Sequence, residues 1–208
     1  MLISGLQKLT LLDYPGKIAC TIFTYGCNFC CPFCHNASLV IRQAEGDISE
    51  DELFSFLKKR QGILEGVCIT GGEPTINKEL PDFIRKIKAL GYSVKLDTNG
   101  YNPQMLKLLL DEKLVDYVAM DIKNSLDKYA LTTGLKSIDE EKICTSVKMI
   151  VDSGIEHEFR TTVTKDFHDE KSLLSAAGII GQESRYFLQQ FKDSGDPQTI
   201  AMLDQRSA

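Results

Sequence analysis

The chain has 208 residues, of which 43% are hydrophobic and 25% are charged. This composition can bury a substantial core and shows no internal shift, so we expect one domain over residues 1–208. The formal net charge of −5 leaves no broad basic face, which argues against a protein that binds nucleic acid. Asp13 and Pro15 interrupt the N-terminal apolar run before it reaches the length of a signal peptide or a membrane span. We therefore expect a cytoplasmic protein with no membrane contact.

Short β-branched or apolar runs alternate with amphipathic stretches along the chain. The runs predict six strands, over Lys17–Tyr25, Gly66–Thr70, Tyr92–Asp97, Val115–Ile122, Glu156–Val163 and Arg185–Phe191. The stretches between them predict five helices, over Glu50–Gln61, Glu79–Leu90, Pro103–Glu112, Asp139–Asp152 and Glu170–Ile180. Two of these helices carry start signals, which are Ser49 with Glu52 three residues later and Asn102 followed by Pro103.

This alternation predicts the fold class. Strands that are separated by helices pair in parallel through right-handed crossovers, which gives an α/β domain. Six units are too few to close an eight-stranded barrel, so we expect an open, partial (β/α)6 barrel with parallel strands. Cys27, Gly71, Asp97 and Asp121 each follow a predicted strand end, where this architecture places functional residues.

The loop after the first predicted strand carries a dense group of cysteines. Four of the seven cysteines, at positions 27, 30, 31 and 34, fall within eight residues, too close together to cross-link distant parts of a fold. In a chain without a secretion signal, such a group indicates a metal or cluster site, because thiolates are soft ligands for iron–sulfur clusters and zinc. We expect the remaining cysteines, Cys20, Cys68 and Cys144, to be ordinary core residues.

Two ligand sets can be drawn from this loop. Cys27, Cys31 and Cys34 would bind three corners of a cubane and leave its fourth iron open to a cofactor or substrate, with Cys30 as a bystander. The pairs Cys27/Cys30 and Cys31/Cys34 would instead form a four-thiolate zinc site. The zinc set is sterically awkward, because adjacent Cys30 and Cys31 would both have to point at one metal ion.

The spacing Cys27-x3-Cys31-x2-Cys34 resembles the cluster motif of the radical S-adenosylmethionine (SAM) superfamily. The surrounding GCNFCCPFCHN and the upstream LQKLTLLDYPGK are similar to the glycyl-radical-enzyme activating enzymes, especially the short activating proteins of anaerobic ribonucleotide reductase. The resemblance implies a fold of the radical SAM type, a [4Fe-4S] cluster and SAM as cofactors. It also implies that Phe33 holds the adenosine and that His35, beside the cluster, is a hydrogen-bonding or adenine-contacting group.

Gly71-Gly72-Glu73-Pro74 follows the second predicted strand. By itself it predicts a strand-to-helix connection. Beside the cysteine loop it resembles the GGEP motif, in which the glycine backbone and Glu73 receive the amino group of the methionine part of SAM. Glycine allows a close approach of the backbone, and a carboxylate pairs with an ammonium group.

Two further strand ends carry acidic motifs, Asp97-Thr98-Asn99-Gly100 and Asp121-Ile122-Lys123. The first could be a simple Asn-Gly turn. The resemblance implies that Asp97, Thr98 and Asp121 bind a monovalent cation and that the two motifs, Asn99 and Lys123 included, contact SAM. Two carboxylates at one strand mouth would repel each other unless a cation or Lys123 lies between them.

Arg160 lies within the strand-like EFRTTV. A lone arginine among apolar residues must meet an anion. The resemblance implies the carboxylate or ribose of SAM, and a salt bridge to Glu158 or Asp121 is the alternative. In the last predicted strand we expect Gln189 or Gln190 to face the site, whereas His157 and His168 have no motif around them and are expected to be surface or capping residues.

The resemblance implies reductive cleavage of SAM to a 5′-deoxyadenosyl radical, which takes an α-hydrogen from a glycine of a partner glycyl radical enzyme. Anaerobic ribonucleotide reductase is the first choice of partner, and a flavodoxin or ferredoxin is the expected electron donor. One alternative is a radical SAM enzyme that acts on a small molecule, as a deazaguanine synthase does. The other is a zinc-stabilised binding module without catalysis.

Overall fold

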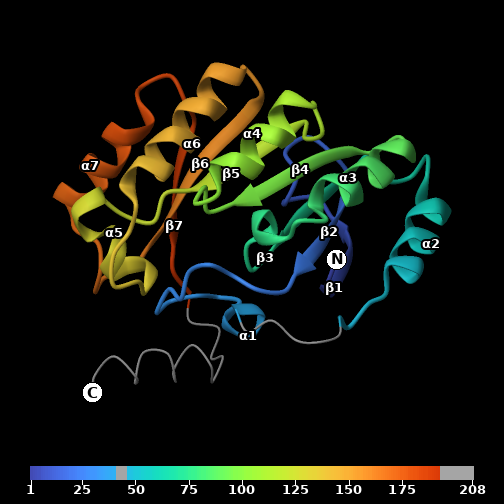
Figure 1. Cartoon of the computed structure of the whole chain (residues 1–208), viewed down its shortest axis with the longest axis horizontal. Helices are drawn as coiled ribbons and strands as arrows, with labels where there is room; N and C mark the ends of the chain where they lie inside the picture. The colour runs from blue at the N-terminus through green and yellow to red at the C-terminus, as the bar shows by residue number, and fades with distance from the viewer. Residues whose placement is uncertain (41–45, 193–208) are drawn as a thin grey trace.

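The computed structural model describes residues 1–40 and 46–192. A seven-stranded sheet in the order β1-β2-β3-β4-β5-β6-β7 runs through the molecule, with β1 antiparallel to β2 and all other neighbours parallel (Figure 1). The strands are β1 (Ile3–Thr10), β2 (Ala19–Thr24), β3 (Gly66–Gly71), β4 (Ser93–Thr98), β5 (Tyr117–Asp121), β6 (Glu156–Val163) and β7 (Tyr186–Gln190). The sheet is open, and β2–β7 are the six predicted parallel strands, so the prediction of an open α/β fold is confirmed.

Helices connect the strands and lie along one face of the sheet, where Figure 1 shows α3, α4, α6 and α7 in a row. They are α1 (Ala37–Val40), α2 (Glu50–Arg60), α3 (Leu80–Ala89), α4 (Pro103–Asp111), α5 (Leu126–Thr133), α6 (Glu140–Ser153) and α7 (Glu170–Ile180), with a 3₁₀ turn η1 (Pro74–Ile76). Both predicted caps are present: the Ser49 and Glu52 side chains form a capping box, and Asn102 accepts a hydrogen bond from the Met105 amide.

One strand, β1, and two α-helices, α1 and α5, were not predicted from the sequence, nor was the 3₁₀ turn η1. β1 pairs with one neighbour and is half exposed, so its apolar residues do not form the continuous run of a buried strand. Helices α1 and α5 have only four and eight residues, too short for a clear apolar period. The left-handed Gly134, with φ of 79°, caps the end of α5 and is the signal that could have found that helix.

The two faces of the central strands carry different chemistry because successive side chains of a strand point to opposite faces. On β4, Val94 and Leu96 are fully buried in the apolar core, which includes Leu106 of α4 and Ile143 of α6. The other face of β4 carries Lys95 and Asp97, which form an ion pair. The apolar face therefore holds the helices in place, and the opposite, concave face carries charged groups.

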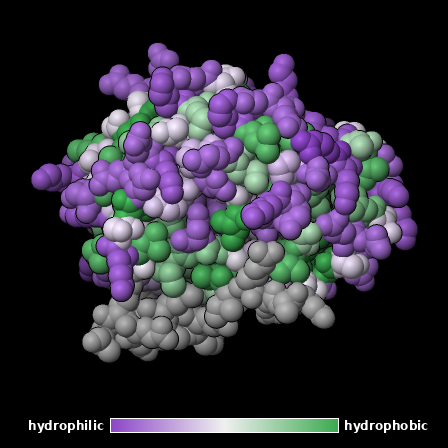
Figure 2. Space-filling view, in the orientation of Figure 1, coloured by the Kyte–Doolittle hydropathy of each residue, from purple (hydrophilic) through white to green (hydrophobic). Residues whose placement is uncertain are grey.

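The surface is mainly hydrophilic in the view of Figure 2, with apolar side chains in small groups. Cys20 and Cys68 are buried in strands as predicted, but the prediction of a core position for Cys144 is wrong. Cys144 is exposed because Ile143 and Val147 of α6 occupy the side of the helix that packs into the core. Within residues 1–40 and 46–192, no helix is both long and apolar enough to cross a membrane.

Two glycines press the end of β3 against the start of the cysteine loop. Gly71 has a φ of 117°, and a Cβ there would lie 2.2 Å from the Thr24 amide nitrogen. A Cβ on Gly72 would lie 2.0 Å from the carbonyl oxygen of Gly26. Two hydrogen bonds hold these backbone segments together. The Gly72 amide donates to the Thr24 carbonyl at 2.9 Å, and the Glu73 amide donates to the Gly26 carbonyl at 2.8 Å.

Substituting Gly72 tests this contact. We predict that Gly72→Ala lowers the free energy of unfolding by about 3 kcal/mol, because the added methyl group displaces backbone and not a flexible side chain. Gly178→Ala on α7 is the control: no atom lies within 4 Å of its added Cβ, so helix propensity should raise the free energy of unfolding by about 1 kcal/mol. Urea unfolding measures both values, and a Gly72→Ala protein as stable as the wild type would contradict the account.

Candidate functional site

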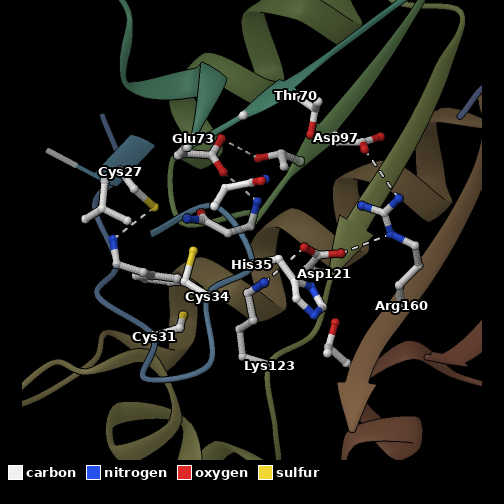
Figure 3. Close-up of a pocket in the computed structure, with 18 of the residues that line it drawn as sticks. Cys27, Cys31, Cys34, His35, Thr70, Glu73, Asp97, Asp121, Lys123 and Arg160 are labelled. Atoms are coloured by element: carbon white, nitrogen blue, oxygen red, sulfur yellow. Dashed lines mark hydrogen bonds and ion pairs between the residues drawn. The ribbon is translucent and has the colours of Figure 1, made fainter. Parts of the chain in front are cut away.

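A pocket lies at the carboxyl ends of the parallel strands (Figure 3). Its lining includes every residue that the sequence analysis selected: Cys27, Cys31, Phe33, Cys34, His35, Gly71, Gly72, Glu73, Asp97, Thr98, Asn99, Asp121, Lys123 and Arg160. Gln189 also lines the pocket, whereas Gln190 is not part of the lining. The fold thus brings together motifs that are separated by more than a hundred residues in the sequence.

The cysteine loop forms one wall of the pocket, and Figure 3 shows the sulfur atoms of Cys27, Cys31 and Cys34 on the same side. Cys30 is exposed and is not part of the lining; its amide donates to the carbonyl of Thr133, which ties the loop to α5. Burial raises the pKa of Cys27 to about 12 and that of Cys31 to about 11. These thiols therefore need a positively charged partner, such as iron, to become thiolates.

An aromatic group continues this wall beyond the cysteines. Phe33 is 7% exposed, and its ring centroid lies 5.5 Å from that of Phe167 and 6.2 Å from that of Phe191. The His35 ring stacks on Phe191 at 4.9 Å with an interplanar angle of 13°, and its Nε2 lies 2.9 Å from the Lys192 carbonyl oxygen. Phe33 and His35 thus present flat surfaces next to the cysteines, which suits the stacking of a purine.

Glu73 is buried and connects two strand ends. Its Oε1 accepts hydrogen bonds from the Thr98 hydroxyl at 2.7 Å and from the Thr75 amide at 3.1 Å, and its Oε2 accepts one from the Asn99 amide at 2.6 Å. Burial raises the pKa of Glu73, and these hydrogen bonds act in the opposite direction. The Asn99 side chain donates in turn to Asn28 at 2.7 Å, so Glu73 and Asn99 join β3 and β4 to the cysteine loop.

Charged side chains form the wall opposite the cysteines (Figure 3). Arg160 lies between two carboxylates, with Nε 3.0 Å from Asp121 Oδ1 and Nη1 3.4 Å from Asp97 Oδ2; Glu158 Oε1 lies 3.9 Å away. Lys123 Nζ lies 2.9 Å from Asp121 Oδ2. The structural alternative for Arg160, a salt bridge to Asp121 or Glu158, is therefore present, and Asp97 is an additional partner.

These pairs set the ionisation of the wall. Burial alone would raise the pKa of Asp121, but Lys123 and Arg160 beside it hold that pKa well below its usual range. In the same way burial disfavours the charged forms of Lys123 and Arg160, and the neighbouring carboxylates nevertheless raise the pKa of both. All three groups are therefore charged at neutral pH.

Lys95 was not selected from the sequence; it is not part of the pocket lining, but its partner Asp97 is. Lys95 is 1% exposed and is ion-paired with Asp97. The alternation in Val94-Lys95-Leu96-Asp97 places both charged residues on the same face of β4, and this is the signal that could have found it.

The two unassigned histidines are structural. His157 contacts the Ile155 carbonyl and the Ser184 hydroxyl at 2.7 and 3.0 Å and does not line the pocket. His168 Nε2 lies 2.8 Å from the Lys123 carbonyl oxygen, and its ring contacts that of Phe33 edge-on at 6.1 Å. His168 therefore ties the loop after β6 to the loop after β5, as a capping residue does.

Comparison with known proteins decides the family. The family model described as the radical SAM superfamily matches residues 21–173. The chain belongs to the radical SAM superfamily. Enzymes of this superfamily use a [4Fe-4S] cluster and SAM.

Individual relatives agree with this family. A protein of Methanocaldococcus jannaschii, provisionally named a glycyl-radical enzyme activating enzyme, is 35% identical over 94% of this chain and 82% of its own length. A provisionally named GTP 3′,8-cyclase of Saccharolobus solfataricus is 30% identical over 64% of this chain and 42% of its own length. The crystal structure of Streptococcus suis SuiB bound to SAM has the same fold, with a TM-score of 0.65 and 14% identity over 88% of this chain and 45% of that one.

The pocket fits the cofactors of the radical SAM superfamily. Three thiols line it together, two of them, Cys27 and Cys31, with raised pKa values, and the tight glycine contact at Gly71 and Gly72 leaves backbone without side chains in its lining. Among the residues that the structure describes, no three Cys, His, Asp or Glu side chains converge on one point where a single metal ion could bind them. A [4Fe-4S] cluster does not require this, because each thiolate binds a different iron atom.

Replacing Cys30 and Cys31 by alanine, one at a time, distinguishes the iron–sulfur ligand set from the zinc ligand set. We predict that Cys31→Ala abolishes cluster assembly, because Cys31 lines the pocket. Cys30 is exposed and does not line the pocket, so Cys30→Ala should keep about four iron atoms per chain. Anaerobic reconstitution followed by iron and sulfide analysis gives the answer. Equal loss of iron in both variants, or zinc in place of iron, would contradict this assignment.

Proposed function

We propose that this protein is a radical SAM activating enzyme that generates a glycyl radical on a partner enzyme, with anaerobic ribonucleotide reductase as the first choice of partner. The observation that carries the proposal is one pocket that combines the CxxxCxxC, GGEP, DTNG and D-x-K motifs of such enzymes. The relative from M. jannaschii supports it, because its similarity extends over nearly the whole of this chain and most of its own.

In this proposal the cysteine wall holds the cluster. Cys27, Cys31 and Cys34 supply three thiolates, which leaves one iron open to SAM. When bound, the reduced cluster supplies the electron that cleaves SAM into methionine and a 5′-deoxyadenosyl radical. The aromatic surfaces of Phe33 and His35 hold the adenosine and exclude water from the space in which the radical forms.

The charged wall would hold the methionine part of SAM. The Gly71 and Gly72 backbone and the Glu73 carboxylate would receive the ammonium group of SAM, together with the amide groups of Asn99. The cationic groups of Lys123 and Arg160 would pair with the carboxylate of SAM. These contacts fix the orientation of the sulfonium bond relative to the cluster, which is the main contribution that the protein can make to the reaction.

The open sheet supports a protein as substrate. β1 and β7 are its two edges and do not pair with each other, so the pocket is not enclosed by a complete ring of strands. An extended glycine-bearing segment could enter from this side, where Gln189 of β7 lines the pocket. In the cell, the proposal requires an anaerobic, reducing cytoplasm and a flavodoxin or ferredoxin as electron donor.

A second function has one observation in its favour. The similarity to the GTP 3′,8-cyclase of S. solfataricus indicates that this fold also occurs in an enzyme named for a nucleotide substrate. This chain spans less than half of that protein, however, so the similarity does not extend to its remaining part. A small-molecule substrate is therefore the alternative outcome of the test.

The test combines the cluster-loaded protein with SAM, dithionite and purified anaerobic ribonucleotide reductase from the same genome, without oxygen. We predict the electron paramagnetic resonance signal of a glycyl radical and about one 5′-deoxyadenosine per radical, since one hydrogen atom moves from glycine Cα to C5′. A reductase with alanine in place of the radical glycine is the control and should give no signal. Cleavage of SAM coupled to GTP or another small molecule, with no radical on any protein, would contradict the proposal.

A further inference from the structure

Charges on the concave face of the sheet balance one another. Three carboxylates and three cationic groups from β4, β5, β6 and the loop after β5 are connected by ion pairs: Asp97, Asp121 and Glu158 with Lys95, Lys123 and Arg160. The three formal negative charges and the three formal positive charges of this set cancel. No further ion is required to offset its carboxylates.

Lys95 is the most deeply placed member of this set. Lys95 is 1% exposed, and its Nζ forms an ion pair with Asp97 Oδ1. The same ammonium group lies 5.7 Å from the centre of the Tyr117 ring, and the Tyr117 hydroxyl donates to Glu158 Oε2 at 2.8 Å. A buried ammonium group is costly unless an anion is paired with it, and the ion pair with Asp97 supplies that anion.

The expected ligand atoms of a monovalent cation are all engaged. One carboxylate oxygen of Asp97 forms an ion pair with Lys95, and the other forms one with Arg160. Asp121 likewise meets Arg160 with Oδ1 and Lys123 with Oδ2. The Thr98 hydroxyl donates to Glu73 and accepts from the Gly100 amide at 3.1 Å. An added cation would have to enter between groups of its own charge.

We propose that the ammonium group of Lys95 takes the place of a bound monovalent cation at Asp97, so that this enzyme holds the methionine part of SAM with its own charges alone. Lys95 acts as a positioning residue, because it reaches the cofactor only through Asp97 and Arg160. The expectation of a cation on Asp97, Thr98 and Asp121 is thereby replaced by its stated alternative, side-chain cations between the carboxylates. The inference rests on the assignment of the pocket to SAM and not on the identity of any glycyl radical partner.

Salt exchange on the wild-type protein is the first test. Isothermal titration calorimetry measures SAM binding to the protein with its oxidised cluster, so that no sodium dithionite is present. The dissociation constant should agree within about twofold in potassium chloride and in choline chloride at equal ionic strength, because screening is then the same. Saturable strengthening of SAM binding by potassium or sodium in the wild type would overturn the proposal.

Variants of Lys95 provide the second test. In choline chloride, Lys95→Met should weaken SAM binding by about tenfold and keep the iron content, and potassium should restore most of the affinity by pairing with the exposed Asp97 oxygen. Lys95→Arg retains the charge and should remain independent of potassium. The double variant K95M/D97N should show no response to potassium, because the anion that would attract the ion is gone.

The control for these variants is Lys107→Met on α4, whose side chain is 62% exposed and pairs with Asp111 away from the pocket. It should bind SAM as the wild type does in both salts. A merely structural role for Lys95 would lower stability without creating dependence on potassium. Unchanged binding by Lys95→Met in both salts would overturn the proposal, and if that variant fails to fold, the wild-type salt exchange and Lys95→Arg still decide the question.

Discussion

The placement of Arg160 between Asp97 and Asp121 is the interaction on which the pocket depends. Asp97 of β4, Asp121 of β5 and Arg160 of β6 lie on neighbouring parallel strands and form ion pairs, and without the guanidinium group the two carboxylates would repel each other. Breaking such a partly buried pair costs far more than an exposed salt bridge, because the remaining charges keep no partner. The ion pairs therefore hold β4, β5 and β6 in place around the cofactor site.

The cysteine side of the pocket depends on a different constraint, close packing of backbone. Gly71 and Gly72 bring the end of β3 against Thr24 and Gly26, where no side chain fits, and Glu73 then connects the same segment to Asn99. Hydrogen bonds thus attach the cluster loop to β3 and β4. A loop that is held in this way lowers the entropy cost of placing three thiolates around one cluster.

Much of this site could be predicted from the sequence, because its motifs carry their chemistry in residue type and spacing. The positions of Cys27, Glu73 and Asp121 after strands followed from apolar runs with polar residues directly behind them. Lys95 belongs to no such motif; the alternation along β4 could have placed it on the face of Asp97, but its ion pair depends on the side chains of the folded sheet. The exposure of Cys144 depends on the rotation of α6 about its own axis, which one cysteine does not reveal.

The fold was predictable to a similar extent and for similar reasons. Buried parallel strands such as β3 and β5 are short continuous apolar runs, and these were found close to their true limits. The edge strand β1 and the short helix α5 bury only part of their surface, and their periodicity is correspondingly weak. Cofactor chemistry followed from the motifs, whereas the partner protein depends on surfaces for which the sequence has no comparable signature.

Reductive cleavage of SAM is the measurement that tests the central claim most directly. The protein would be reconstituted with iron and sulfide without oxygen, reduced with dithionite, supplied with SAM and analysed for 5′-deoxyadenosine by chromatography. The account predicts that 5′-deoxyadenosine forms in proportion to the cluster content and is absent when the cluster is omitted. A loaded cluster that accepts electrons but never cleaves SAM would contradict it, and the protein would then share the fold of radical SAM enzymes without their reaction.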